Sequence, residues 1–215
     1  MKKKLEPVSD PLIHSREVTG YDCRLLSDES PWQRWMTFYT TGRFGTLEDG
    51  RFHQHCGPTA LTNIVCAVER RRNMALNDPA EVFLRCAELG RRRATYWNVN
   101  EKYHLGGTSY LLLPSYAAAC LRQFGIRDAR VTARLVATPE QMAAEIARGR
   151  LLCLSLFRHQ CYGSHVVVAY GAVRISPAGR GAPRLYLRIA DSWWPRPRYL
   201  AADTLGVCGY VAVEA

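Results

Sequence analysis

The chain has 215 residues, enough for one substantial hydrophobic core, and neither its composition nor any internal repeat indicates a disordered or repetitive protein. Its formal net charge is +10, yet among its 29 basic residues the only lysines are Lys2, Lys3, Lys4 and Lys102. We interpret the excess of arginine as codon bias. Because no nucleic-acid-binding motif accompanies the charge, the sequence disfavours nucleic acid as a partner.

The N-terminal stretch begins with lysines, as a signal peptide does, but no apolar region follows them. No later run approaches the roughly 20 apolar residues that a membrane-spanning helix needs. We therefore expect a cytoplasmic protein without a membrane span. Residues 1–17 are predicted to form a loosely held arm and residues 18–215 a single domain. Residues 18–50 show no clear periodicity and are expected to pack across the outside of the functional site.

The first clear element is a helix within residues 53–72, which read HQHCGPTALTNIVCAVERRR. Pro58 suits the first turn of a helix, and apolar residues then recur at helical spacing on one face: Leu61, Ile64, Val65 and Val68. This places Cys56 at the start of the helix, where unpaired N–H groups favour the nucleophilic thiolate. Gly57 is expected to leave space beside the sulfur for a substrate backbone.

A second helix is predicted from Pro79, capped by Asn77 or Asp78 and ended by Gly90. Residues 96–109 are interpreted as a loop whose aromatic side chains line a cleft.

A third helix is predicted at about residues 114–124, closed by Gly125. Thr138 and Gln141 then form a capping box for a short helix that reaches Gly149.

The second half of the chain is predicted to be mostly strands. One strand lies near Val131, and β-branched and aromatic runs begin at Leu151, His165, Arg184 and Val207, separated by turn-forming residues. Helices followed by strands predict an α+β domain of two lobes with a groove between them. The helical half is expected to carry the cysteine, and an antiparallel sheet in the second half is expected to carry the other site residues.

Two residues of these strands are candidate partners of Cys56. A cysteine nucleophile needs a nearby base, and that base needs a third group to orient it. His165 begins one strand and Asp191 ends the next. Antiparallel neighbours bring such positions to the same edge of a sheet, so we expect that edge to face the start of the Cys56 helix.

The motifs CGPTALTN, Gly-x-His-x-Val and ADSWW resemble, over about residues 50–200, the papain-like cysteine peptidases. The likeness is strongest to the branch that includes the leader peptidases of bacteriocin exporters. It implies a two-lobe papain-like fold with Cys56 as nucleophile, His165 as general acid and base, and Asp191 as the orienting residue. It also implies cleavage of a peptide or protein substrate through a thioester acyl-enzyme, without metal or cofactor.

The sequence departs from that family at the oxyanion hole. The exporter peptidases carry a glutamine about six positions before the cysteine, where this chain has Gly50. We expect Gln54 to donate instead, together with the backbone N–H of Cys56. Trp193 or Trp194 is expected to shield the contact between the histidine and the aspartate from water.

Alternative interpretations remain open at this stage. The same site could transfer an acyl group to an amine, as a transglutaminase does, or be a catalytically silent peptide-binding module. A zinc site at His53, His55 and Cys56 is disfavoured because no second ligand pair accompanies it. Ser164 lacks the GxSxG elbow of a serine hydrolase. The eight cysteines include no CxxC pair and are interpreted as reduced, mostly buried residues.

Overall fold

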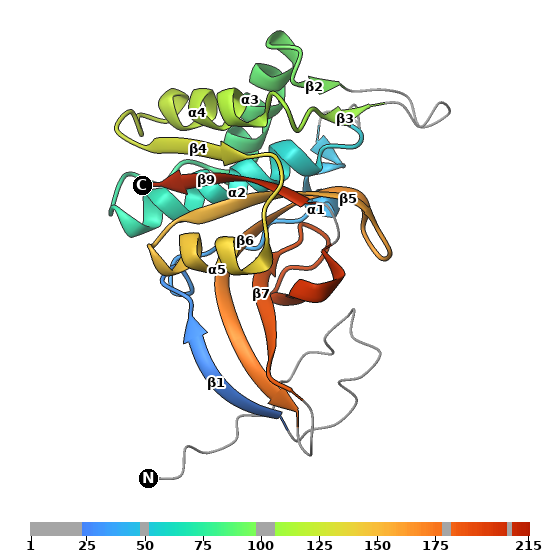
Figure 1. Cartoon of the computed structure of the whole chain (residues 1–215). Coiled ribbons are helices and arrows are strands. Elements are labelled where there is room, and N and C mark those ends of the chain that lie inside the picture. Colours follow the sequence, from blue (N-terminus) through green and yellow to red (C-terminus); the bar gives the residue numbers. More distant parts are fainter. Residues whose placement is uncertain (1–22, 48–51, 98–105, 178–181, 206–207) are drawn as a thin grey trace.

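The computed structural model describes residues 23–47, 52–97, 106–177, 182–205 and 208–215 (Figure 1), so the predicted arm at 1–17 lies outside the described residues. The described helices are α1 Thr41–Phe44, α2 Cys56–Arg71, α3 Pro79–Arg92, α4 Leu113–Gln123, α5 Pro139–Ala147 and the 3-10 turn η3 Ala202–Thr204. The strands are β1 Cys23–Glu29, β2 Tyr96–Trp97, β3 Gly107–Thr108, β4 Arg130–Arg134, β5 Leu151–His159, β6 Gly163–Pro177, β7 Arg184–Ala190, β8 Arg198–Ala201 and β9 Cys208–Glu214. The chain is thus an α+β protein, as predicted.

The main sheet has the strand order β4-β9-β5-β6-β7-β8, with β1 also pairing with β6, and every described pair in it is antiparallel. β5 pairs with the first part of the long strand β6, and β1 pairs with its last part. Figure 1 shows β1, β6 and β7 extending together away from the helices. The sequence did not reveal β1, β8 or the β2–β3 pair.

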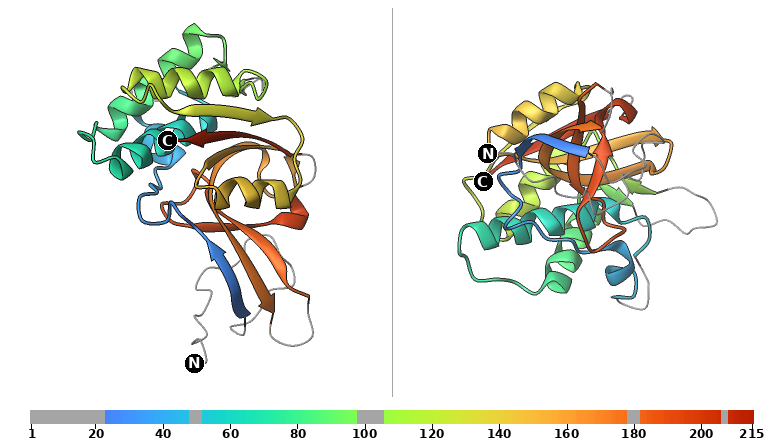
Figure 2. Two further views of the ribbon diagram at one scale, coloured as in Figure 1. Left: turned by 60° about the vertical axis from the view of Figure 1, so that its left-hand side comes forward. Right: turned by 90° about the horizontal axis from the view of Figure 1, so that it is seen from below.

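Both faces of the sheet are covered, as the right-hand view in Figure 2 shows with α2 and α5 on opposite sides. Leu151 and Cys153 of β5 pack in the cluster that contains α2, whereas Leu152 and Leu154 pack with Met142 of α5. A strand buried on both faces is apolar at every position rather than at alternate ones. This explains the continuous apolar run LLCL at residues 151–154, all four of which are buried.

Helix α2 is buried on all sides rather than on the single face that its spacing predicted. Every residue from Gly57 to Glu69 is buried, because the sheet covers one side while α3 and α4 cover others. Buried polar groups of α2 are paired: the amide of Asn63 accepts from the backbone N–H of Tyr39 (2.8 Å) and donates to its carbonyl oxygen (2.9 Å). This exchange fixes the segment before α1 against the helix that begins at Cys56.

The predicted helix caps are largely confirmed. The Asp78 side chain accepts from Ala80 N–H at the start of α3, and Thr138 and Gln141 form the reciprocal capping box of α5. Gly90, predicted to end α3, instead lies inside the helix, which continues to Arg92. A Cβ atom at position 90 would lie 2.8 Å from atoms of Tyr116 and Tyr96, so glycine is needed there for close packing rather than for helix termination.

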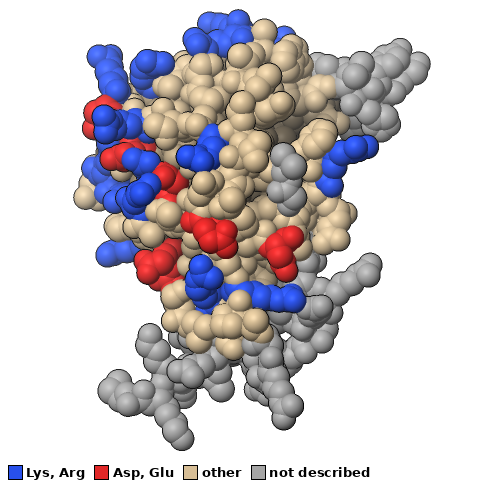
Figure 3. Space-filling model, viewed as in Figure 1, with Lys and Arg blue, Asp and Glu red and all other residues tan. Residues whose placement is uncertain are grey.

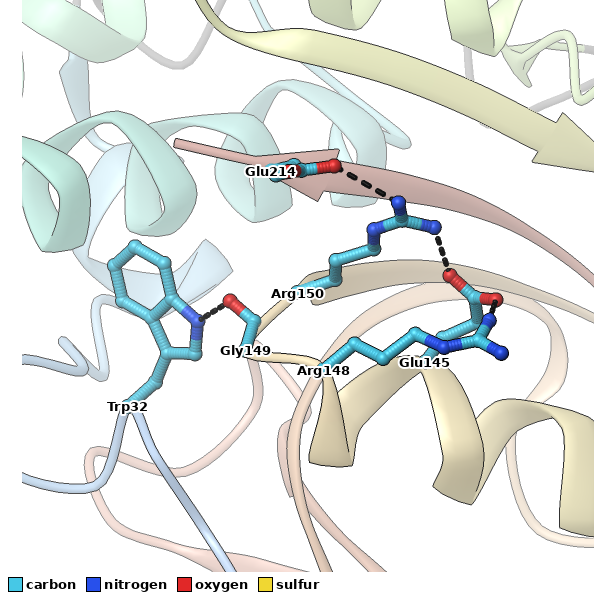
Figure 4. Close-up of polar contacts among 6 residues, drawn as sticks. All are labelled: Trp32, Glu145, Arg148, Gly149, Arg150 and Glu214. Carbon is cyan, nitrogen blue, oxygen red and sulfur yellow. Dashed lines mark hydrogen bonds and ion pairs between the residues drawn. The ribbon is translucent and has the colours of Figure 1, made fainter.

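The segment before α1 is also fixed to the turn between α5 and β5 (Figure 4). The buried indole of Trp32 donates to the carbonyl oxygen of Gly149 at 2.7 Å. Next to this contact, Arg150 bridges Glu214 (2.8 Å) and Glu145. The indole thus joins the segment around Trp32 to the α5–β5 turn, and Arg150 joins that turn to α5 and β9.

The stretch interpreted as a loop at residues 96–109 contains the short β2–β3 pair, and residues 98–105 lie outside the described residues. Tyr96 is buried, and its hydroxyl donates to the His53 carbonyl oxygen at 2.6 Å. Among the described residues, no helix combines the length and the apolar character required to cross a bilayer.

Candidate active site

All the sequence-predicted site residues except Asp191 come together at one pocket of about 250 Å³ between the start of α2 and the β5–β6 hairpin. Cys56, His165, Gln54 and Trp193 all line it. The remaining lining residues are Thr41, His55, Tyr162 and Ser164. Residues from four separate parts of the chain therefore meet around the sulfur.

Cys56 begins α2, as predicted, and its sulfur lies against strand β6. The backbone N–H of Val166, the residue after His165, and the N–H groups of Gly57 and Cys56 lie near the sulfur and favour its charged form. Burial nevertheless raises the pKa of the Cys56 thiol, because the loss of hydration outweighs these three donors. The prediction that this thiol ionises readily is therefore wrong.

His165 is buried and donates from Nε2 to the backbone carbonyl oxygen of Asp191 at 2.7 Å. A carbonyl oxygen only accepts, so Nε2 carries the proton and Nδ1 of the neutral ring is the basic nitrogen. Burial lowers the pKa of His165, although the carbonyl group and the charge of Asp191 oppose this shift. Sulfur and imidazole are thus both expected to be neutral near pH 7.

Asp191 orients His165 with its main chain and not with its carboxylate, which corrects the expectation taken from the papain-like resemblance. Its Oδ1 accepts from the backbone N–H groups of Trp193 and Trp194, both at 3.0 Å. Its Oδ2 accepts from the Tyr162 hydroxyl at 3.1 Å. The carboxylate therefore shapes the turn after β7, and that turn presents the carbonyl group to the imidazole.

Two aromatic rings flank the imidazole. The ring of Tyr162 stacks on His165 at 5.6 Å with an interplanar angle of 9°, and the ring of Trp193 lies 4.8 Å away at 41°. Of the two tryptophans expected to shield this contact, Trp193 is the one whose ring packs against the histidine. The ring of Trp194 instead lies beneath the guanidinium groups of Arg196 and Arg198.

Gln54 lies on the pocket wall, two residues before Cys56, with an exposed side chain. Its backbone φ is 52°, in the left-handed region that non-glycine residues seldom adopt. Such backbone strain often accompanies functional positions. Gly50, where the exporter peptidases carry their glutamine, lies outside the described residues.

Gly57 does not leave room for a substrate backbone, contrary to expectation. A Cβ atom at this position would lie 2.1 Å from Oγ1 and 2.7 Å from Cβ of Thr108. The space beside Gly57 is therefore filled by strand β3, and glycine is required here because two protein segments pack closely.

His55 is occupied by contacts within the protein. Its Nδ1 lies 3.0 Å from Oγ1 of Thr59, its ring packs edge-on against Phe83, and burial lowers its pKa to about 4. Across the described ranges, no three His, Cys, Asp or Glu side chains are grouped as metal ligands would be. The cysteines from Cys56 to Cys208 form no disulfide, and most of them are buried, as predicted.

Searches with the sequence returned no matching family model and no matching curated protein. The geometry of the site must therefore carry the functional argument for this chain.

Sequence reasoning missed two residues of the pocket. Thr41 lies more than a hundred residues from His165 in sequence, and it reaches the site because its N–H and hydroxyl both bond to the Ser192 carbonyl oxygen. No sequence signal indicated this. Tyr162 was detectable in principle, because an aromatic residue in a tight hairpin turn three positions before a strand histidine is well placed to contact its ring.

The charged surface gives no support to a nucleic-acid partner. On the face shown in Figure 3, basic side chains at the left edge are intermixed with acidic ones. Several arginines of the helices pair with neighbouring acids, such as Arg72 with Asp128 (2.7 Å) and Arg92 with Glu88 (3.0 Å). Intermixed charges reduce the continuous positive potential that nucleic-acid binding uses.

Proposed function

We propose that this protein is a thiol-dependent hydrolase that cleaves peptide or other amide bonds through an acyl-enzyme on Cys56. The observation that carries the proposal is that Cys56 and His165, from opposite parts of the fold, line the same pocket, with the backbone N–H of the residue after the histidine near the sulfur. A thiol that shares a pocket with a base whose basic nitrogen is defined is the arrangement that covalent catalysis requires.

The reaction begins from a neutral pair. As the sulfur attacks the substrate carbonyl carbon, His165 Nδ1 takes the thiol proton, and the resulting imidazolium keeps its Nε2 hydrogen bond to Asp191. The tetrahedral intermediate expels the amine, which receives that proton from Nδ1. Water, deprotonated by the same nitrogen, then attacks the thioester and releases the acid, and the proton returns to the sulfur.

The developing oxyanion needs hydrogen-bond donors at the start of α2. The N–H of Cys56 lies in the first turn, where helix N–H groups lack partners inside the helix, and the Gln54 side chain lies on the same pocket wall. We assign these two groups to the oxyanion hole. A single donor of this kind typically contributes about 3 to 4 kcal/mol to transition-state stabilisation.

The arrangement of elements supports a papain-like assignment. The helix that begins at the cysteine packs against an antiparallel sheet, and the histidine lies near the start of a strand of that sheet. The chain thus resembles the papain-like peptidases in the placement of this helix and strand and in the three sequence motifs. It differs from the family pattern in the oxyanion donor and in the group of Asp191 that contacts the histidine.

The test uses a peptide library digested in water enriched in oxygen-18. Hydrolysis through Cys56 places one heavy oxygen in each new carboxylate, and the products are absent with Cys56→Ala and with His165→Ala. If an added amine instead takes up the acyl group, the product is a new amide that carries no heavy oxygen. That result would identify the protein as an acyltransferase. A wild-type protein that yields no product, and no Cys56 adduct with peptide aldehydes or vinyl sulfones, would contradict the proposal.

A further inference from the structure

Tyr162 contacts both of the groups that position the proposed base. Its hydroxyl donates to the buried carboxylate of Asp191, and its ring stacks in parallel on the imidazole of His165. The same ring also packs against Trp193 at 4.9 Å. Among the pairs described at this site, no other side chain is seen in contact with both His165 and the Asp191 carboxylate.

The turn that carries Tyr162 is held rigidly. His159 Nδ1 accepts from the backbone N–H groups of Cys161 (3.2 Å) and Tyr162 (3.4 Å). The Thr204 hydroxyl donates to the Ala201 carbonyl oxygen at 2.7 Å, so it accepts from Nε2 of His159, 3.2 Å away. The neutral His159 ring, a donor at one nitrogen and an acceptor at the other, therefore links the β5–β6 turn to η3.

We propose that Tyr162 is a positioning residue of this site, which holds the His165 ring and the turn after β7 in register so that the imidazole keeps its bond to the Asp191 carbonyl oxygen. This role rests on the proposed function only in that His165 is taken as the base. Two contacts from one rigid side chain fix the distance between the imidazole and the turn, as second contacts do for catalytic histidines generally.

The Tyr162 hydroxyl remains a donor throughout the working pH range. Burial raises its pKa, and the neighbouring Asp191 charge raises it further, so the phenol keeps its proton. The Asp191 side chain has no exposed surface and relies on Tyr162 and two backbone N–H groups for its hydrogen bonds. Removing the hydroxyl leaves Oδ2 without this donor.

The test compares Tyr162→Phe, which removes only the hydroxyl, with Tyr162→Leu, which also removes the stacked ring. Tyr170→Phe is the matched control, since the Tyr170 hydroxyl is buried and makes no hydrogen bond to any described residue. The primary measurement is the pKa of His165 from its ring-proton shift in histidine-labelled protein. The second measurement is the rate at which a peptide vinyl sulfone modifies Cys56.

In Tyr162→Phe the Asp191 carboxylate loses one hydrogen-bond donor, so its negative charge stabilises the imidazolium more strongly. The titration midpoint of His165 is therefore expected to rise by about 0.5 pH unit. In Tyr162→Leu, water reaches the ring and the midpoint rises further, while the probe rate falls about tenfold. Tyr170→Phe is expected to change neither quantity. A merely structural role would lower the melting temperature without moving the titration of the folded protein.

The two proposals fail in different ways. If wild-type protein never reacts with the probe but the His165 midpoint moves as expected, positioning by Tyr162 stands and the hydrolase assignment fails. If both Tyr162 variants titrate and react as the wild type does, the positioning role is overturned whatever the activity of the protein.

Discussion

The imidazole of His165 is bound by the main-chain carbonyl oxygen of Asp191, 2.7 Å from Nε2, while the carboxylate of the same residue faces Tyr162 and the tryptophan N–H groups. Asp191 thus acts on the base through the shape of its turn. Substitutions at Asp191 distinguish this arrangement from one in which the carboxylate itself contacts and stabilises the imidazolium.

Asp191→Asn is expected to reduce the rate of Cys56 modification or turnover less than about tenfold, because its amide oxygen still accepts from the N–H groups of Trp193 and Trp194. Asp191→Ala removes these hydrogen bonds and releases the turn, so it should reduce the same rate far more. In a triad whose carboxylate orients the histidine directly, the asparagine change alone costs about 10⁴ in kcat. A loss of that size for Asp191→Asn would contradict the role assigned to the carbonyl group.

Alkylation of Cys56 by iodoacetamide should rise with pH through a midpoint above 9, because burial raises the pKa of this thiol. The measurement is site-resolved mass spectrometry in a Cys161→Ser background, which removes the exposed thiol. His165→Ala is expected to change the rate at pH 6 less than about twofold. A plateau between pH 5 and 7 that disappears in His165→Ala would instead reveal a thiolate–imidazolium pair.

Gly57→Ala is expected to displace β3 and to destabilise the protein by about 1 to 3 kcal/mol, because its Cβ would overlap Thr108. The double variant Gly57→Ala/Thr108→Gly removes all three overlapping atoms and should recover part of the lost stability. Chemical denaturation of the two variants and of Thr108→Gly alone measures the coupling. Independent, additive effects would show that the two residues do not share this space.

Trp32→Phe is expected to destabilise the fold by about 1 to 2 kcal/mol, because it removes the bond that joins the N-terminal segment to Gly149 (Figure 4). Trp35→Phe, at a partly buried neighbour in the same segment, is the matched control and should lower the free energy of unfolding by a smaller amount. Urea unfolding followed by far-UV circular dichroism gives both values.

Acidification should destabilise the protein between about pH 6.5 and pH 4. Burial lowers the pKa values of His55, His159 and His165, so the unfolded chain binds protons that the folded protein excludes. The stability is fully present above the unfolded pKa and is lost as the pH falls towards the folded values. For His55, with a folded pKa of about 4, the loss approaches about 3 kcal/mol.

The measurement is urea unfolding at several pH values across this range, repeated with His55→Gln. This variant cannot take up the proton, so its stability should fall less steeply. If the free energy of unfolding falls with decreasing pH equally steeply in the variant and the wild type, His55 does not contribute to the acid sensitivity.

Several elements were predictable because their signals lie within a few neighbouring residues. The Thr138–Gln141 capping box, the Asp78 cap and the start of α2 at Cys56 all depend on local hydrogen bonds and backbone preferences. The pairing of β1 with the far end of β6 was not predictable. It joins residues about 150 positions apart, and the sequence CRLLSDE carries no strong strand signal.

The sequence by itself determined the order Cys56, His165, Asp191 and the elements that carry them, because residue type, spacing and periodicity are local properties. Only the tertiary structure decided that the Asp191 carbonyl group binds the histidine, that Thr108 fills the space beside Gly57, and that Tyr162 stacks on the base. It also decided the protonation of the site, since hydration is lost only when distant segments pack together. A helix start favours the thiolate in isolation, but burial beneath the sheet reverses that preference.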